Sequence, residues 1–220
     1  MGTVLLSERM TGRLREGIHS HSRTAGPADA EVLVVDDERH LAETYSTWLT
    51  ESYSVETAYS GSEALDSIDG RIDVVLLGRQ LSDRPGDEVL ARIRSREFDC
   101  AVAMVTAVEP DFDVVRMEFD DYVTKPLSKD EINNVVDSLL ARKRYDETVN
   151  ELFSLVTKRA VLMEEKPTAE LKRSDEYREL VQRIQTVNTE LDSITYGLSA
   201  RDAEALFAQL DTHERGDADD

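Results

Sequence analysis

The sequence has little cysteine and no long apolar segment, and each shortage excludes a class of protein. Cys100 is the only cysteine among 220 residues, so neither an intramolecular disulfide nor a cysteine-based metal cluster can form. Its place at the head of an apolar segment predicts a buried thiol. No apolar segment approaches the roughly 18 residues of a membrane span, and Val4-Leu5-Leu6 is too short for a signal-peptide core. We therefore expect a cytoplasmic protein without a membrane segment.

Positive charge is also scarce. The 26 basic residues, of which six are Lys, face 46 acidic ones, which gives a formal net charge of -20. Such a surface repels nucleic-acid phosphates, and a carboxylate-rich, lysine-poor composition is typical of proteins from a high-salt cytosol. An ordinary acidic protein is the alternative. The sequence has no helix-turn-helix or zinc motif, so direct binding of nucleic acid is not expected. We expect its basic cluster, Arg142-Lys143-Arg144, to cap a helix dipole.

Short apolar segments alternate with segments of helical spacing between residues 31 and 143. The expected strands are 32–35, 55–58, 72–77, 101–106 and 121–124; the expected helices are 40–49, 61–68, 85–94, a weak one at 113–119 and a long one from Ser128. Near-continuous apolar strands indicate a sheet that is covered on both faces. The alternation predicts an α/β fold with a five-stranded parallel, doubly wound sheet. Residues 1–29 lack periodicity, so we expect a disordered extension there.

The character of the chain changes after about residue 145, where Glu, Arg and Leu dominate and no strand is expected. Lys166-Pro167 interrupts the first helix, and Ser174 is suited to cap a second one. The second helix carries apolar residues at alternating steps of three and four: Tyr177, Leu180, Ile184, Val187, Leu191, Ile194 and Leu198. This heptad stripe predicts a helical hairpin or a dimeric coiled coil, hence a possible homodimer through these helices. A helix that lies on its own domain is the remaining alternative.

Polar side chains follow the strands at the edge where their carboxyl ends meet. Asp36 and Asp37 follow the first strand, Thr106 ends the fourth, and Lys125 follows the fifth. Two carboxylates about 4 Å apart repel by about 1 kcal/mol in water and about 4 kcal/mol at an effective dielectric of 20. Mg²⁺ or the ammonium of Lys125 can compensate this repulsion, and Thr106 can donate to an anion. On chemistry alone, these groups form a magnesium-assisted phosphoryl site that lacks a nucleophile.

Three segments together resemble the motifs of response-regulator receiver domains: Val34-Val35-Asp36-Asp37-Glu38, Thr106-Ala107 and Tyr122-Val123-Thr124-Lys125-Pro126. Residues 72–90 resemble a further receiver motif, in which a strand ends in Asp and a loop with Pro and Gly follows. This resemblance covers roughly residues 31–143 and implies a flavodoxin-like sheet in the order 2-1-3-4-5. From Tyr145 to about Leu198 the chain resembles the HalX domain, a helical module that follows receiver domains in haloarchaea.

The resemblance implies a domain organisation and a set of ligands. We expect a disordered extension at 1–29, a receiver-like domain at 30–144, a HalX-like helical module at 145–211 and an acidic tail at 212–220. By the resemblance, Asp36, Asp37 and the backbone carbonyl of Gln80 would bind Mg²⁺. Thr106 and Lys125 would contact the phosphoryl group.

The resemblance also implies a vacancy. The phosphoacceptor Asp of the family falls on Gly78, and Ser82 replaces the usual Pro in the following loop. Without that carboxylate no aspartyl phosphate can form at position 78, and Mg²⁺ loses a ligand, so only weak binding of Mg²⁺ is expected. Tyr122 would be the aromatic switch residue, and its neighbour Pro126 is expected to follow a cis peptide bond.

Two other aspartates are poorly placed to act instead. Asp83 belongs to the loop five positions beyond Gly78, and Asp73 begins the strand, roughly 16 Å away at about 3.3 Å per residue. The retained polar groups then serve another trigger, such as a bound anion or metal, or are remnants in which Lys125 neutralises the acidic pair.

These residues lead to one functional expectation with two alternatives. We expect a pseudo-receiver of a two-component phosphorelay that is not phosphorylated at position 78 and is not an enzyme, since the sequence has no Ser-His-Asp, P-loop or dinucleotide motif. It would act through contacts with a sensor histidine kinase or other signalling proteins. The alternatives are a phospho-switched regulator with a displaced acceptor, and a transcriptional regulator that acts with a DNA-binding partner.

Overall fold

The computed structural model describes residues 30–96 and 98–197; the expected extension at 1–29 and the acidic tail lie outside the described residues. Five strands form one parallel sheet: β1 (Glu31–Val35), β2 (Ser54–Ala58), β3 (Ile72–Leu77), β4 (Ala101–Thr106) and β5 (Asp121–Thr124). Their order, β2-β1-β3-β4-β5, confirms the expected topology. The bounds of β3, β4 and β5 agree with the predicted ones, because their apolar segments end sharply at polar residues or glycine.

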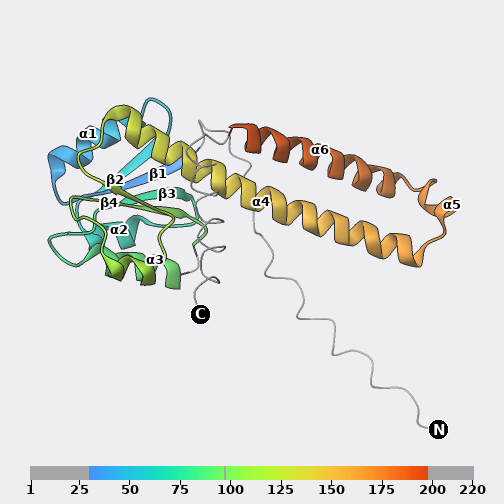
Figure 1. Ribbon diagram of the computed structural model, residues 1–220, viewed down its shortest axis with the longest axis horizontal. Coiled ribbons are helices and arrows are strands. Elements are labelled where there is room, and N and C mark those ends of the chain that lie inside the picture. Colours follow the sequence, from blue (N-terminus) through green and yellow to red (C-terminus); the bar gives the residue numbers. More distant parts are fainter. Residues whose placement is uncertain (1–29, 97, 198–220) are drawn as a thin grey trace, which may run out of the picture.

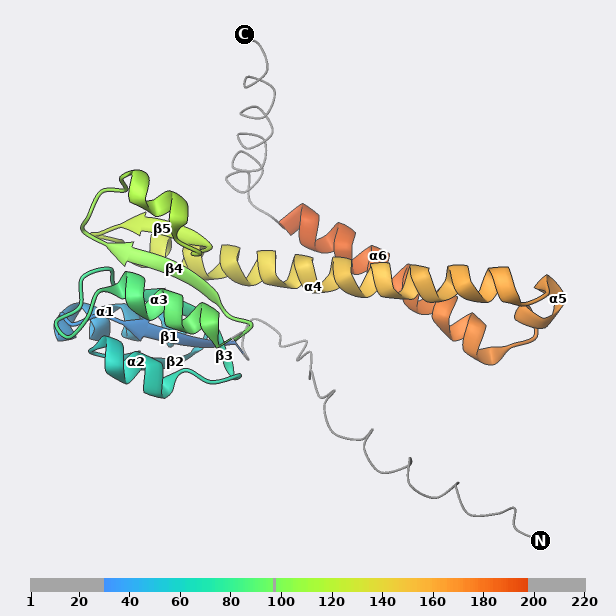
Figure 2. The same cartoon turned by 90° about the horizontal axis from the view of Figure 1, so that it is seen from below.

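Helices cover both faces of the sheet (Figures 1 and 2). On one face, α1 (Arg39–Leu49) and the first turns of α4 (Lys129–Glu165) pack on Val32 and Val34. On the other face, α2 (Gly61–Ser67) and α3 (Gly86–Ser95) pack on Leu33 and Val35. Because side chains of a strand alternate between faces, the apolar segment of β1 supplies both cores.

The expected weak helix at 113–119 is shorter and tighter than predicted. It is a 3₁₀ helix, η2 (Phe112–Arg116). The preceding residue, Asp111, caps it, because the Asp111 side chain accepts a hydrogen bond from the Phe112 N–H at 2.7 Å. Two adjacent β-branched residues, Val114 and Val115, disfavour a longer α-helix. Phe112 and Val115 stay exposed, so this segment contributes little to the core.

The C-terminal part is a helical hairpin that projects from the sheet (Figures 1 and 2). α4 begins with a capping box between Ser128 and Glu131 and continues for 37 residues, about 56 Å at 1.5 Å per residue. It ends before Pro167 as predicted, and a short helix, α5 (Thr168–Leu171), which the sequence did not indicate, forms the turn. α6 (Asp175–Gly197) then runs back beside α4, and the Ser174 hydroxyl accepts a hydrogen bond from the Tyr177 N–H.

As far as Ile194, the predicted heptad stripe lies between α6 and α4 of the same chain, and its last member, Leu198, lies outside the described residues. Ile184 and Val187 are buried, at 7% and 0% exposure, and Leu180, Leu191 and Ile194 are half-buried. Arg183 forks across to α4, with both of its bonds to the Glu151 carboxylate at 2.8 Å. The structure therefore realises the hairpin among the predicted alternatives.

The basic cluster does not lie at a helix end, so the expectation that it caps a dipole is wrong. Arg142-Lys143-Arg144 lies in the interior of α4, which continues to Glu165. The Lys143 ammonium donates to the Asp99 carbonyl at 2.6 Å and pairs with Asp73 at 3.1 Å. The cluster thus ties α4 to the amino edge of the sheet. The domain division proposed at residue 144 falls inside this uninterrupted helix.

Within the described ranges, no helix is both long and apolar enough to cross a bilayer.

Candidate functional site

Four of the predicted site residues meet at the carboxyl edge of the sheet. Asp36 follows β1 and Gly78 follows β3, and these strands are neighbours, with Val35 paired to Leu77. The Gly78 N–H donates to the Val35 carbonyl at 2.9 Å. Thr106 is paired to Thr124 where β4 and β5 end, and the next residue is Lys125. Strand order and register alone therefore bring these groups together.

Lys125 and Asp36 form a buried ion pair. The Lys125 ammonium lies 2.5 Å from Asp36 Oδ2, and the two side chains are 14% and 4% exposed. Asp36 Oδ1 accepts a hydrogen bond from the Glu38 N–H at 3.1 Å. The Lys125 N–H donates to the Thr106 carbonyl at 2.8 Å, and the Lys125–Pro126 peptide bond is cis, as expected. Both carboxylate oxygens of Asp36 thus have partners supplied by the protein.

The remaining metal-ligand candidates are far less enclosed. The Asp37 side chain is exposed, and no described residue pairs with it. Gln80 is exposed as well and forms an isolated bridge with Pro85 in the loop after β3. Within residues 30–96 and 98–197, the structure contains no cluster of three or more Asp, Glu, His or Cys side chains that could hold a metal ion. Since Asp36 is already neutralised by Lys125, this donor set suits Mg²⁺ poorly and leaves Asp37 as the unpaired carboxylate.

Gly78 is buried, and Leu81 fills the space beside it. A Cβ built on Gly78 would lie 3.1 Å from the Val35 carbonyl oxygen and 3.2 Å from Leu81 Cδ2. The half-buried Leu81 side chain packs against the core on the face of α2 and α3. Even a Cβ at position 78 would therefore require both the Val35 carbonyl and Leu81 to shift by a few tenths of an ångström.

A second glycine holds the loop from Arg79 to Pro85 closed. The Gly86 N–H donates to the Arg79 carbonyl at 2.7 Å, and a Cβ on Gly86 would lie 2.2 Å from the Gly78 carbonyl oxygen. Only glycine allows the start of α3 to approach the end of β3 so closely. In the sequence Gly86 looks like an isolated helix-start residue, so nothing indicated this contact.

Neither alternative aspartate is free to act at position 78. Asp83 accepts hydrogen bonds from the Gly61 and Ser62 N–H groups at 2.8 and 3.0 Å, and from the Ser62 hydroxyl at 2.7 Å. The Ser62 hydroxyl and these N–H groups hold the pKa of Asp83 well below its ordinary value. Asp73 lies at the other edge of the sheet, where it accepts from the Glu31 N–H and pairs with Lys143. Both carboxylates are part of the scaffold.

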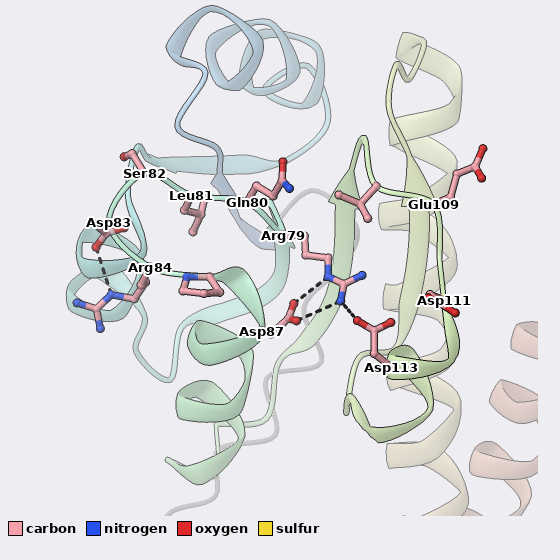
Figure 3. Close-up of a pocket in the computed structure, with 12 residues that line it drawn as sticks. Arg79, Gln80, Leu81, Ser82, Asp83, Arg84, Asp87, Glu109, Asp111 and Asp113 are labelled. Carbon is pink, nitrogen blue, oxygen red and sulfur yellow. Dashed lines mark hydrogen bonds and ion pairs between the residues drawn. The ribbon is translucent and has the colours of Figure 1, made fainter.

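Arg79 is a site residue that the sequence reading missed. Its guanidinium bonds Asp87 of α3, at 3.2 and 3.3 Å, and Asp113 of η2 (Figure 3). These carboxylates, Asp113 first, raise the pKa of Arg79. The guanidinium lines a pocket of about 780 Å³ between the loops after β3 and β4. The pairing of Arg79 with residues 8 and 34 positions away leaves no local signal in the sequence.

The loop after β4 is held by Thr106 and Tyr122 together. Thr106 is buried, and its hydroxyl accepts a hydrogen bond from the Val108 N–H at 3.1 Å. The Tyr122 hydroxyl donates to the Val108 carbonyl at 2.7 Å, and its ring lies 5.5 Å from that of Phe119. Both predicted residues therefore contact one short loop, and the Thr106 hydroxyl, which accepts from Val108, keeps its own O–H to donate to an anion.

A doubly wound sheet whose carboxyl edge holds a buried Asp–Lys pair beside a threonine defines the receiver class of protein. Residues 32–137 match the response regulator receiver domain family, and residues 141–207 match the HalX domain family. The chain is therefore a response regulator receiver domain followed by a HalX domain.

Individual proteins are similar to this chain in sequence or in fold. A Haloferax volcanii protein named "Putative transcriptional regulator" is 44% identical over 164 residues, which are 74% of this chain and 28% of that protein. The chain thus spans less than a third of that relative. Solved structures with this fold include a CheY-like receiver domain protein from Methanospirillum hungatei JF-1 (TM-score 0.50, 22% identity, 53% of this chain and 98% of that chain). A signal receiver domain from Vibrio parahaemolyticus has the same TM-score at 24% identity, over 55% of this chain and 96% of that chain.

Proposed function

We propose that this response-regulator-like protein carries a pseudo-receiver, which is not phosphorylated at position 78 and signals through protein contacts. The observation that carries the proposal is the buried Gly78 at the end of β3, beside the Asp36–Lys125 pair. A receiver domain transfers a phosphoryl group to an aspartate at the end of this strand, and glycine offers no oxygen to accept it.

The partners of the other polar groups support the same proposal. Lys125 is paired with Asp36, and Asp83 accepts hydrogen bonds from the first turn of α2. Neither side chain is therefore free to bind a phosphoryl group. A structural role for the Asp36–Lys125 pair accounts for its burial without any ligand. Mg²⁺ binding is correspondingly weak in this proposal, because Asp37 is the one unpaired carboxylate among the three expected ligands.

The proposed partners are proteins, in a cytoplasmic setting. A sensor histidine kinase or another signalling protein would contact the receiver domain, and the HalX hairpin would carry the output, with no catalysis by the chain itself. With a net charge of -20, the chain is poorly suited to bind nucleic acid directly.

A second candidate function is transcriptional regulation together with a DNA-binding partner. The name of the Haloferax volcanii relative, "Putative transcriptional regulator", favours it. Under this candidate the hairpin would recruit a separate DNA-binding protein.

Incubation with acetyl phosphate and Mg²⁺ in molar KCl, followed by a phosphate-affinity gel, tests the main proposal. The wild-type chain is expected to show no Mg²⁺-dependent, hydroxylamine-labile band. Gly78→Asp combined with Leu81→Ala is expected to create one, because the smaller residue leaves room for the new carboxylate. Gly78→Asn with Leu81→Ala is the matched control, with the same shape and no nucleophile.

A labile band in the wild-type chain would contradict the proposal. Its loss in Asp83→Asn would then identify a displaced acceptor and favour the phospho-switched alternative. A band that survives Asp83→Asn would be located by mass mapping.

A further inference from the structure

An exposed apolar stripe follows the outer half of α4, on a side that α6 does not cover. Its large members are Val149, Phe153, Val156 and Met163, which are all exposed, and Phe153 reaches 75% exposure. Ala160 lies between the last two and is exposed as well. In a chain of strongly acidic composition, four large apolar side chains on one exposed helix face indicate a surface that binds a partner.

The spacing of the stripe is that of a coiled-coil seam. The five residues follow one another at steps of four, three, four and three, which is the a/d pattern of a heptad repeat. The stripe spans about 21 Å at 1.5 Å per residue. At about 100° per residue, the middle of the stripe lies roughly 160° around α4 from Glu151, which faces α6. α4 therefore has two separate seams, and the hairpin fills one of them.

We propose that the second seam of α4 pairs with the same seam of a second copy of this chain, in parallel orientation. The result is a dimer with two α4 helices at its centre and one α6 on each outer side. α6 does not offer a comparable surface, because its large apolar residues from Tyr177 to Ile194 are all buried or half-buried. The seam is thus different from the α6 stripe that the sequence predicted for association.

Charge complementarity fixes the partner and the orientation. With Val149, Val156 and Met163 at d positions, Arg159 takes a g position and Glu164 an e position. A parallel pair brings g next to the e position of the following heptad on the partner, so each Arg159 meets a Glu164 of the other copy. Both residues are exposed and have no ion pair within the described chain. Full antiparallel overlap of the same stripe would instead place Arg159 beside Leu152 and Glu164 beside Asn150, which brings no opposite charges together.

An anionic membrane fits this face less well. Glu164 borders the stripe, and Glu151 and Glu165 lie on the opposite side of α4, whereas a membrane-surface helix carries Lys and Arg on its polar side. A self-pairing helix accounts for both the heptad spacing and the Arg159–Glu164 pattern.

Light scattering of the full chain at about 100 μM in molar KCl is the primary test. The expected mass is twice the 24.8 kDa of one chain. Phe153→Glu is expected to weaken dimerisation by more than about 100-fold, because two buried charges replace two aromatic anchors. Ser154→Glu, one position away and off the seam, is the matched control and is expected to leave the mass unchanged. Circular dichroism confirms that both variants keep their helices.

Disulfide trapping identifies the occupant and its direction. Oxidation of Val149→Cys is expected to yield a covalent dimer, because equal positions face each other in a parallel seam. An equimolar mixture of Val149→Cys and Met163→Cys would instead give the mixed dimer if the helices were antiparallel, which overturns the orientation. Cys100 gives little background, because its thiol is buried. A monomeric wild-type chain without cross-links, for example with its own C-terminal segment on the seam, overturns the proposal.

Charge reversal gives an independent readout. Arg159→Glu is expected to weaken the dimer by about 3- to 10-fold at the lowest KCl concentration that keeps the chain folded, since exposed pairs are modest and salt-screened. The double variant Arg159→Glu/Glu164→Arg is expected to recover the wild-type affinity. Unchanged association of Arg159→Glu would show that Arg159 and Glu164 do not meet across the seam and would overturn the proposed orientation.

Discussion

The ammonium of Lys125 reaches the carboxylate of Asp36 at 2.5 Å, although β3 and β4 lie between their strands in the sheet. The contact joins the carboxyl ends of β1 and β5, which are 89 residues apart in the sequence. It closes the carboxyl edge of the sheet beside Gly78. It places opposite charges where adjacent acidic residues alone would repel each other. In this chain the pair serves the fold, whatever other role it has.

Removal of the ammonium is expected to destabilise the domain strongly. Lys125→Met leaves Asp36 buried without its counter-charge, which costs about 3–5 kcal/mol of unfolding free energy. Urea unfolding in molar KCl measures this cost. The matched control is Lys129→Met, which breaks the exposed Lys129–Glu51 pair and is expected to cost less than about 1 kcal/mol. Similar losses for the two variants would show that the Asp36–Lys125 pair is not structural.

Gly86 is expected to tolerate no side chain. Gly86→Ala would push a methyl group against the Gly78 carbonyl and open the loop, at a cost of about 1–3 kcal/mol or more. Gly70→Ala is the control, since a Cβ there meets no atom within 4 Å and is expected to be neutral within about 0.5 kcal/mol. Thermal unfolding of the two variants side by side checks the difference, and an unaffected Gly86→Ala would show that the loop is not closed as described.

The Cys100 thiol is expected to make stability depend on alkaline pH. Burial raises the pKa of this thiol from 9.0 to about 11. Between these values the folded state holds a proton that the unfolded state has lost, so the unfolding free energy is highest below pH 9 and falls as the pH rises toward 11. The full loss is expected to be about 3 kcal/mol, which is two pKa units at about 1.4 kcal/mol per unit.

Urea midpoints at pH 8 and pH 10.5 measure this slope. Cys100→Ala serves as the reference, because it removes the titrating group and leaves the other alkaline titrations in place. Equal slopes in the two chains would contradict a buried, proton-retaining thiol.

The inner seam of the hairpin is expected to affect folding rather than association. Ile184→Ala removes a buried side chain between α6 and α4 and is expected to cost about 2–3 kcal/mol of hairpin stability. Gln185→Ala, exposed on the next position, is expected to be neutral. Urea unfolding followed by far-UV circular dichroism checks the cost. A fall from dimer to monomer mass without a loss of stability would show that α6 is the dimer seam after all.

Much of the scaffold could be predicted because its signals are local. The apolar segments of β3, β4 and β5 end at Gly78 or at polar residues, so their bounds follow directly from the sequence. Lys166-Pro167 marks the end of α4 because proline cannot continue a helix, and Ser174 caps α6. The bounds of η2, between β4 and β5, are harder to predict. Its five residues include the adjacent Val114 and Val115, which disfavour an α-helix, and the segment is too short for a clear periodic pattern.

The sequence predicts which polar residues form the site, but it does not predict how their side chains are paired. Parallel strands place Asp36, Thr106 and Lys125 at one edge whatever the details of packing. That Lys125 is committed to Asp36, and that Asp83 is committed to α2, depends on side-chain reach across loops. Arg79, Leu81 and Gly86 were missed for the same reason, since their contacts join segments without any periodic pattern.

The sequence by itself determined the order of strands and helices along the chain, the residues at the carboxyl edge and the glycine at position 78. These features depend only on residue identity and on the periodicity of short segments. The tertiary structure alone decided which surfaces are used up. It placed the α6 stripe against α4 and left a second heptad stripe on α4 exposed, because helix pairing depends on the turn at α5 and on the Arg183–Glu151 contact. It also placed Leu81 beside Gly78, which only the closed loop between β3 and α3 could bring there.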